Sequence, residues 1–205
     1  MCGVAGFFYN KNASPPPWVS RDTLVKMTGT ISHRGPDGNG AVFDDGYGLG
    51  HVRLSILDVT EASAQPMWCH NHRYLLTYNG EIYNFKALKQ ELEAKGYKFT
   101  TTGDTEVLLY ALIEWRENTF FKLEGMFAGA FLDTHTNQAI IFRDQLGIKP
   151  LYISPYDNGI LFASEAKAFL PALYKFSLNR AAVYEHMTFR YVAGERTLFN
   201  EVKRL

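Results

Sequence analysis

The chain has 205 residues, of which 46% are hydrophobic and 15% aromatic, enough for one well-packed domain. Basic and acidic residues both number 21, so no net charge favours a nucleic acid or an anionic membrane surface as partner. A secretory signal pattern and a long apolar run are also missing, and we therefore expect a cytoplasmic protein with no nucleic-acid or membrane partner.

The chain opens with MCGVAGFF, in which only Met1 precedes Cys2. A thiol becomes a strong nucleophile when a nearby base takes its proton, and removal of Met1 would place a free α-amine beside this thiol. The alternative is a buried apolar cysteine in an N-terminal strand. The only other cysteine is Cys69, and a core of this size needs no disulfide, so we expect two free thiols in a reducing compartment.

Strands and two helices are expected to follow along the chain. Residues 48–57 and 72–78 are rich in leucine, isoleucine, valine and tyrosine, and turn residues bound them, as is typical of strands. A helix is expected over 85–95, with Asn84 as its N-cap and Gly96 as its stop. A second helix is expected over 106–115, with an apolar face of leucines. Further strands are expected over 126–133, 138–144, 150–154 and 159–164.

Asn158 and Gly159 predict a hairpin, because this pair tolerates the positive φ angles of a type I′ turn. Strands joined by hairpins run antiparallel, which argues for the α+β class rather than a parallel nucleotide-binding sheet. The sequence contains neither GxxxxGK[ST] nor GxGxxG, so the common phosphate-binding loops are missing. We therefore expect no ATP site in this chain.

Four further residues have the chemistry to bind a small zwitterion around the thiol. Asn79 and Gly80, expected in a turn after a strand, offer two donors for an oxyanion, or form a plain turn. Arg53 lies among apolar residues and either clamps a carboxylate or forms a surface ion pair. Asp104 either binds an ammonium group or caps the second helix. The residue types alone leave these alternatives open.

Three other segments are given no chemical role. The run CHNH over 69–72 lacks a second ligand group at a suitable spacing, so we expect no metal site. The run SPPPW over 14–18 is either a stiff surface loop or a proline-rich recognition peptide. The phenylalanines of the helix-to-strand connection are expected in the core rather than in a nucleic-acid stacking platform; these are Phe120, Phe121, Phe127 and Phe131.

Nine blocks in order together resemble one family: MCGVAGFF, SHRGPDGNG, LGHVRLSILD, QPM, YNGEIYNF, GDTEVLL, EGMFAGAFLD, RDQLGIKPLY and FASEAKAFL. The residues of these blocks and their order along the chain are similar to those of the glutaminase domain of glutamine-hydrolysing asparagine synthetases. That domain is a class II glutamine amidotransferase of the N-terminal nucleophile hydrolase type. The resemblance covers nearly the whole chain, and it implies a single domain over 1–205.

The resemblance implies a four-layer αββα sandwich of two stacked antiparallel sheets. It also implies hydrolysis of L-glutamine to L-glutamate and ammonia through a γ-glutamyl thioester on Cys2, with Asn79 and Gly80 as the oxyanion donors. By the same match, Arg53 binds the substrate α-carboxylate and the α-amino group meets two carboxylates. The implied substrate-binding residues are Arg53, Leu54, Ser55, Ile56, Leu57, Glu81 and Asp104.

The same resemblance implies a mobile loop over 33–38 near the thiol, with an ordinary surface turn as the alternative. The runs RDQLGIKPLY and SEAKAF are given structural roles only. Gly103 stands where the family pattern leads us to expect serine.

Similar full-length proteins continue into a synthetase domain, and we expect that domain to be absent from this chain. ATP and Mg²⁺ are therefore expected only in that missing part, and no cofactor here. The expected partner is a C-terminal synthetase domain or a separate acceptor subunit, and a homodimer stays open. A different ammonia acceptor and a catalytically silent scaffold remain as alternative functions. An exposed apolar patch is expected over 169–176, where the partner would dock.

Overall fold

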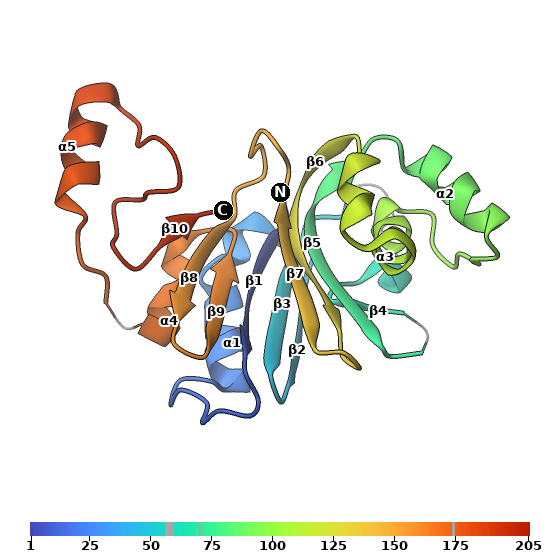
Figure 1. Cartoon of the computed structure of the whole chain (residues 1–205), viewed down its shortest axis with the longest axis horizontal. Coiled ribbons are helices and arrows are strands. Elements are labelled where there is room, and N and C mark those ends of the chain that lie inside the picture. Colours follow the sequence, from blue (N-terminus) through green and yellow to red (C-terminus); the bar gives the residue numbers. More distant parts are fainter. Residues whose placement is uncertain (56–59, 70, 174) are drawn as a thin grey trace.

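Two antiparallel sheets form the centre of the computed structural model, which describes residues 1–55, 60–69, 71–173 and 175–205 (Figure 1). The larger sheet has the order β10-β8-β9-β1-β3-β2, and the smaller has the order β4-β5-β6-β7. The larger sheet contains β1 (Gly3–Tyr9), β2 (Gly38–Asp44), β3 (Tyr47–Arg53), β8 (Tyr152–Tyr156), β9 (Gly159–Ala163) and β10 (Lys203–Arg204). The smaller contains β4 (Met67–Trp68), β5 (Tyr74–Ile82), β6 (Gly125–Asp133) and β7 (Gln138–Arg143).

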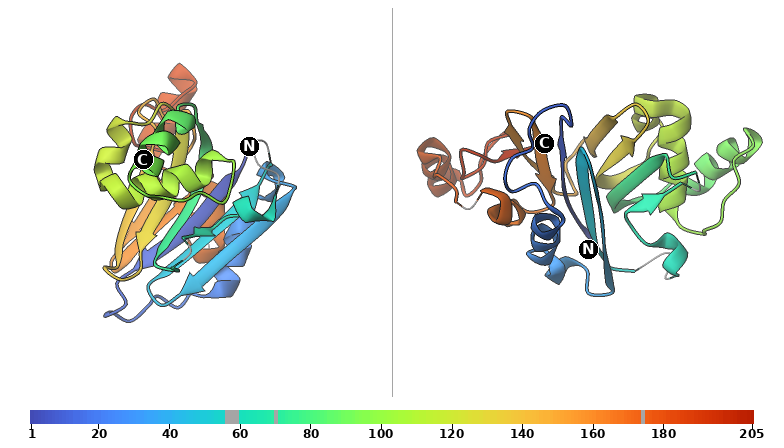
Figure 2. Two further views of the ribbon diagram at one scale, coloured as in Figure 1. Left: turned by 90° about the vertical axis from the view of Figure 1, so that its right-hand side faces the viewer. Right: turned by 90° about the horizontal axis from the view of Figure 1, so that it is seen from below.

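Helices cover the outer face of each sheet (Figure 2). The helices α1 (Arg21–Gly29) and α4 (Leu170–Leu173) pack over the larger sheet, while α2 (Phe85–Ala94) and α3 (Asp104–Trp115) cover the smaller one. Helix α5 (Arg180–Phe189) stands apart at the β10 end of the larger sheet (Figure 1). Short 3₁₀ helices lie at Ser32–Arg34, Glu61–Ser63, Arg116–Phe121 and Ala166–Phe169. The expected α+β class and αββα layering are therefore confirmed.

Strand alternation distributes the apolar side chains into three layers. On β5, Leu76 and Tyr78 point to the helices, where they join the cluster that α2 and α3 cover. Leu75 points the other way, into the apolar layer between the two sheets, where it meets Leu49 of β3. Each sheet is therefore buried on both faces, which fixes which side chains reach the space between the sheets.

The helix predicted over 85–95 is confirmed as α2, and Gly96 ends it with a φ of +95°. Asn84 stands at the N-cap position, but its side chain does not cap the helix. Its Nδ2 donates to the Lys122 carbonyl at 2.8 Å, and its Oδ1 accepts from the Glu124 N–H at 3.1 Å. The asparagine thus ties the helix to the segment before β6.

The turn predicted at Asn79 and Gly80 is wrong. Both residues lie inside β5, where they pair with Ala128 and Phe127 of β6. The strand continues because β6 offers partners as far as Gly125. The hairpin predicted around Asn158 is confirmed between β8 and β9, although its turn has no positive φ and is not type I′.

Two predictions about apolar exposure need correction. Phe121 is 89% exposed, although the other three phenylalanines of its group pack in or against the core. The patch predicted over 169–176 is wrong for most of its described part: Leu170 is 41% exposed, but Phe169 and Ala172 are buried and Phe176 packs on Phe199; Tyr174 lies outside the described residues. Five other exposed apolar side chains lie in α5 or close to it in the sequence, and we term them the α5 surface: Leu178, Tyr184, Met187, Phe189 and Tyr191.

Cys2 and Cys69 are both free thiols. Cys69 is buried in the core and contacts Asn71, whereas Cys2 is half-buried. No helix in the described part of the chain has the length and apolar character needed to cross a membrane. No group of three or more potential metal ligands gathers among the described residues.

A buried carboxylate joins the end of β6 to the residue before β5 and to the 3₁₀ helix that follows α3. Asp133, fully buried at the end of β6, accepts two hydrogen bonds from Arg73 at 2.8 and 2.9 Å and one from Arg116 at 3.0 Å. The guanidinium of Arg73 also lies over the Tyr74 ring. Arg73, followed by Arg116, holds the pKa of the Asp133 carboxyl well below its usual range. This lowered pKa means that the ionised carboxylate stabilises the fold above the ordinary carboxyl pKa.

We predict that Asp133→Asn lowers the free energy of unfolding at pH 7 by about 2–4 kcal/mol, because it leaves two partly buried guanidinium groups without their anion. The ionised Asp133 stabilises the parent less and less as pH falls from the ordinary carboxyl pKa toward the lower folded-state pKa. The difference in free energy of unfolding between parent and variant therefore narrows below about pH 4. Urea unfolding at several pH values measures the loss of stability at pH 7 and its dependence on pH. Asp157→Asn, at an exposed turn position, is the matched control and should change little.

Candidate active site

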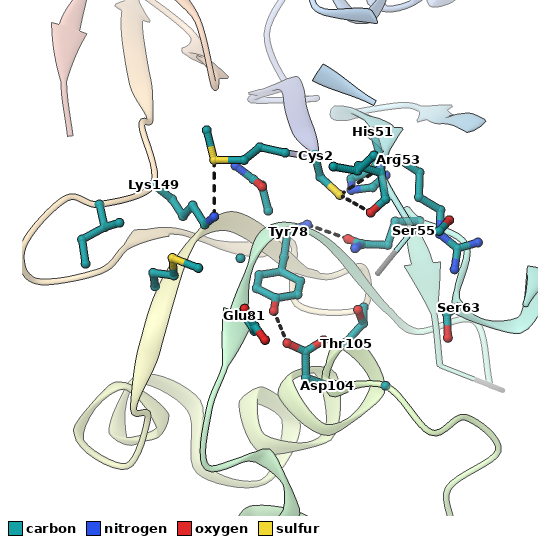
Figure 3. Close-up of a pocket in the computed structure, with 18 residues that line it drawn as sticks. Cys2, His51, Arg53, Ser55, Ser63, Tyr78, Glu81, Asp104, Thr105 and Lys149 are labelled. Carbon is teal, nitrogen blue, oxygen red and sulfur yellow. Dashed lines mark hydrogen bonds between the residues drawn. The ribbon is translucent and has the colours of Figure 1, made fainter. Parts of the chain in front are cut away.

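A pocket of about 370 Å³ lies where β1 and β3 of one sheet approach β5 of the other (Figure 3). The side chains around it come from both sheets, from the start of α3 and from the loop after β7. Its lining consists of Met1, Cys2, His51, Arg53, Leu54, Ser55, Ser63, Gln65, Tyr78, Asn79, Gly80, Glu81, Gly103, Asp104, Thr105, Met126, Ile148 and Lys149.

Cys2 reaches the pocket because it directly precedes β1. Gly3 pairs with Val52 of β3, which brings the thiol beside the end of that strand. Its Sγ lies 3.3 Å from the Leu54 N–H and 3.4 Å from the Leu54 carbonyl oxygen. Arg34 donates from Nε to the Cys2 carbonyl at 3.0 Å, and its Nη1 pairs with Glu165 at 3.0 Å. The sulfur of Cys2 is therefore held by the Leu54 backbone, and its carbonyl is held by Arg34.

The edge of β5 beside the thiol is open because β4 is short. The two residues of β4 pair only with Leu75 and Leu76, so within the described part of the chain no strand pairs with the rest of this edge of β5. Successive N–H groups of a strand point to opposite sides, and those of Tyr78, Gly80 and Ile82 share the open side. The Tyr78 N–H donates to Gln65 Oε1 at 2.7 Å, and the Ile82 N–H donates to Asp104 Oδ2 at 2.9 Å.

The Gly80 N–H lies between these two bonded groups. Phe127, its partner residue on β6, turns both of its backbone polar groups to Asp144: the Phe127 N–H donates to Asp144 Oδ2 at 3.2 Å, and the Phe127 carbonyl accepts from the Asp144 N–H at 2.7 Å. The Gly80 N–H therefore does not bond β6 and points to the open edge. A ligand oxygen at this edge would meet a free backbone donor.

Unpartnered polar atoms gather around the pocket. Among the described residues, five buried side-chain nitrogen or oxygen atoms lack a hydrogen-bond partner, and four of them belong to His51, Ser63 and Asn79. Buried polar groups are nearly always paired in native proteins, since an unpaired one costs roughly 1–3 kcal/mol. The Asn79 Nδ2 donor adjoins the Gly80 N–H in the sequence. The pocket thus has hydrogen-bonding capacity that a bound molecule would satisfy.

His51 is almost completely buried, and its ring is neutral at physiological pH. Burial lowers its pKa to about 4, against a smaller opposite effect of the Tyr78 backbone. It lies on the same face of β3 as Arg53, two residues away, so strand alternation could have found it in the sequence. The sequence analysis gave it no role.

Opposite charges occupy separate parts of the pocket. Arg53 is half-buried at the end of β3, and its Nη1 donates to the Thr60 carbonyl at 2.9 Å. Glu81 on β5 and Asp104 at the first residue of α3 supply two carboxylates. Burial raises the pKa of Asp104, the charge of Glu81 adds to this rise, and the hydrogen bond from the Tyr78 hydroxyl opposes it. This distribution of charge matches a zwitterion.

Asp104 is not the cap of its helix. The N-cap position of α3 is Gly103, and the Asp104 carboxylate bonds instead to Tyr78 and Ile82 of β5. The replacement of the expected serine by Gly103 therefore leaves the carboxylate in the pocket. Lys149 is buried beside the N-terminus, where its Nζ lies 3.5 Å from Met1 Sδ. The segment 143–152, given only a structural role, thus also supplies part of the lining.

The structure brings eight of the ten predicted site residues to this one pocket: Cys2, Arg53, Leu54, Ser55, Asn79, Gly80, Glu81 and Asp104. The other two, Ile56 and Leu57, lie outside the described residues. Lining residues that the sequence analysis missed include Tyr78, Ser63 and Gln65, which no local pattern marks. The mobility expected for the loop over 33–38 stays a prediction, although its Arg34 does contact Cys2.

Comparisons with known proteins agree with this geometry. The family model described as the glutamine amidotransferase domain matches residues 1–205. Asparagine synthetase [glutamine-hydrolyzing] 1 of Bacillus subtilis is 40% identical over 207 residues, which cover all of this chain and 32% of the relative. Asparagine synthetase B of Escherichia coli is 39% identical over 172 residues, covering 83% of this chain and 30% of the relative. The chain thus spans about a third of the length of these relatives.

Among solved structures, the glutamine phosphoribosylpyrophosphate amidotransferase of B. subtilis has a similar fold. Its TM-score is 0.67 with 24% sequence identity, and the match covers 82% of this chain and 43% of that chain. At this identity the likeness supports the arrangement of sheets and helices alone.

We predict that Gly80→Ala destabilises the protein by about 1–3 kcal/mol, because a Cβ there would lie 2.4 Å from the Met126 carbonyl oxygen and 2.7 Å from the Phe127 Cα. Neither backbone atom can move without breaking the β5–β6 ladder. Thermal and urea unfolding measure the loss. Gly38→Ala is the matched control, since nothing lies within 4 Å of its added methyl group. Equal stability of the two variants would contradict the packing argument.

Proposed function

The chain belongs to the glutamine amidotransferase domain family, and from this membership we propose that its pocket hydrolyses L-glutamine to L-glutamate and ammonia. The observation that carries the proposal is the pair of free donors beside the thiol. Asn79 Nδ2 has no hydrogen-bond partner among the described residues, and the Gly80 N–H faces the open edge of β5. Two such donors next to a nucleophile fit the oxyanion of acyl transfer.

The proposed reaction has two steps. The Cys2 sulfur attacks the γ-carboxamide carbon, and the oxyanion of the tetrahedral intermediate accepts hydrogen bonds from Asn79 and Gly80. The carbon–nitrogen bond then breaks and the nitrogen leaves as ammonia with the thiol proton, which gives a γ-glutamyl thioester. Water attacks the thioester next, releasing L-glutamate and restoring the thiol. Atoms balance, since one glutamine and one water yield one glutamate and one ammonia.

The ionic ends of glutamine have complementary partners in the same pocket. Arg53 is proposed to bind the α-carboxylate, because a guanidinium can offer it two parallel hydrogen bonds. Glu81 and Asp104 are proposed to bind the α-ammonium group. The backbone of Leu54 and Ser55 lines the remaining wall. The same role is proposed for Ile56 and Leu57.

Removal of Met1 completes the proposed site. The freed α-amine of Cys2 would then be the nearest base for the thiol, within the same residue. Met1 is more than half exposed and itself lines the pocket, so it is accessible to an aminopeptidase and its loss enlarges the space beside the thiol. A protein that retained Met1 would have a blocked amine.

The wider role proposed for the ammonia is ATP-dependent formation of asparagine from aspartate by a synthetase region, as the names of the relatives suggest. Those relatives are about three times as long as this chain. A synthetase domain or subunit is the proposed partner, and the α5 surface is the proposed docking site. Both α5 and Leu205 lie at the β10 edge of the larger sheet, where the Leu205 N–H donates to the Leu151 carbonyl (Figure 1).

We predict that Cys2→Ala abolishes glutaminase activity and labelling by an electrophilic glutamine analogue. Asn79→Ala should lower kcat by roughly a hundred- to a thousandfold, since one oxyanion donor is lost. Ammonia release and intact-mass analysis of the labelled protein are the measurements. Cys69→Ala removes the other thiol, which lies in the core, and should keep activity within a few fold of the parent. Undiminished turnover in Cys2→Ala would refute the mechanism.

For the docking site, we predict slower hydrogen exchange of the α5 amides in the whole native protein or complex than in this chain alone. Burial of the α5 surface is the physical reason, because covered helices open less often. The amides of α1, which already packs on the larger sheet, serve as the internal control. Unchanged exchange in α5 would contradict the proposal, and concentration-dependent protection of the isolated chain would indicate a homodimer instead.

A further inference from the structure

Tyr78 lines the pocket but has no part in the reaction as proposed above. Resting on the proposed function, we infer that Tyr78 is a positioning residue that orients the Asp104 carboxylate toward the α-ammonium group of the substrate. It would thereby make the pocket selective for a free amino acid over a ligand of the same shape that lacks the ammonium group.

The geometry starts from the alternation of β5. Tyr78 points to the helix side of the strand and Asn79 to the side of the facing sheet, so neighbouring residues serve two parts of one pocket. The Tyr78 side chain is almost fully buried, and its hydroxyl donates to Asp104 Oδ2 at 2.5 Å. Figure 3 shows this contact below the thiol, with Glu81 beside it.

One oxygen of Asp104 is thus already occupied. Oδ2 accepts from both the Tyr78 hydroxyl and the Ile82 N–H. These two donors fix the plane of the carboxylate, because they lie on the same rigid strand. A carboxylate has about four acceptor positions, so the second oxygen keeps capacity for a charged donor from the pocket. The substrate ammonium is that donor in the proposed complex.

The hydrogen bond also favours the ionised form of Asp104. Burial and the neighbouring Glu81 raise the pKa of this carboxyl, which works against the ionised form. The donors Tyr78 and Ile82 lower it again. A neutral Asp104 would lose most of its attraction for an ammonium group. Tyr78 therefore acts on binding through charge as well as through orientation.

Tyr78 itself is unsuited to acid–base chemistry. Burial, followed by the charge of Asp104, raises its pKa well above the ordinary tyrosine value, so the hydroxyl stays protonated. Its proton already points to Asp104. Tyr78 acts through the carboxylate and is a positioning residue rather than a catalytic one.

The test measures binding of two ligands to Cys2→Ala protein, which cannot turn them over. One ligand is L-glutamine, and the other is glutaramate, the same molecule without the α-amino group. We expect Tyr78→Phe to weaken L-glutamine binding by roughly ten- to a hundredfold, the range expected for losing a hydrogen bond to a charged group. Glutaramate binding should change less than about twofold. Tyr83→Phe, the same change at an exposed site, should affect neither ligand.

The glutaramate titration also reports whether the pocket is intact in the variant. Equal weakening of both ligands would show a merely structural role and overturn the inference, as would unchanged binding of L-glutamine. If the Cys2→Ala protein binds L-glutamine but the protein with Cys2 intact releases no ammonia, the proposed function fails. The comparison of the two ligands still decides the role of Tyr78 in that case. A parent that binds neither ligand overturns both proposals. In the active protein, Tyr78→Phe should raise KM far more than it lowers kcat.

Discussion

The site depends on one constraint, the hydrogen bonding of β1 on both sides within the larger sheet. Residues of β1 pair with β3 on one side and β9 on the other, so the strand cannot shift without breaking two ladders. Cys2 directly precedes this strand, and its thiol therefore has a fixed position relative to Leu54 and Arg53. Ser164 adds to this by bonding both backbone groups of Val4. A nucleophile at a chain end is normally mobile, and here the sheet removes that freedom.

The second sheet contributes through what it leaves unpaired. Because β4 has only two residues, β5 extends past it and presents backbone donors to the pocket. A longer β4 would pair with the Gly80 N–H and remove the donor proposed for the oxyanion. The size of one short strand thus controls the chemistry available at the thiol. Tight packing of Gly80 against β6 then keeps this edge in place.

Local patterns in the sequence predicted α2, α3 and the longer strands from β3 onward, but not α1 or α5. They also indicated chemical roles for Cys2, Asn79 and Arg53, whereas Glu81 and Leu54 were expected from the family resemblance alone. The helix ending at Gly96 follows from a backbone preference that acts within a few residues. The hairpin at Asn158 forms without the positive φ angles on which its prediction rested. The turn expected at Asn79 failed because pairing with β6, distant in the sequence, outweighs the local preference of an Asn-Gly pair. The prediction that Phe121 lies in the core was wrong for a similar reason, since hydrophobicity alone does not say which side of a 3₁₀ helix packs against the core.

The contact between Tyr78 and Asp104 joins residues 26 positions apart, and no local signal marks it. The two cysteines likewise look equivalent in the sequence but differ once folded, because Cys69 is enclosed by the core while the Cys2 sulfur borders a cavity. A small colorimetric thiol reagent therefore distinguishes native from denatured protein by stoichiometry. One equivalent reacting before denaturation, and a second only afterwards, provides a direct count of correctly folded sites in any preparation.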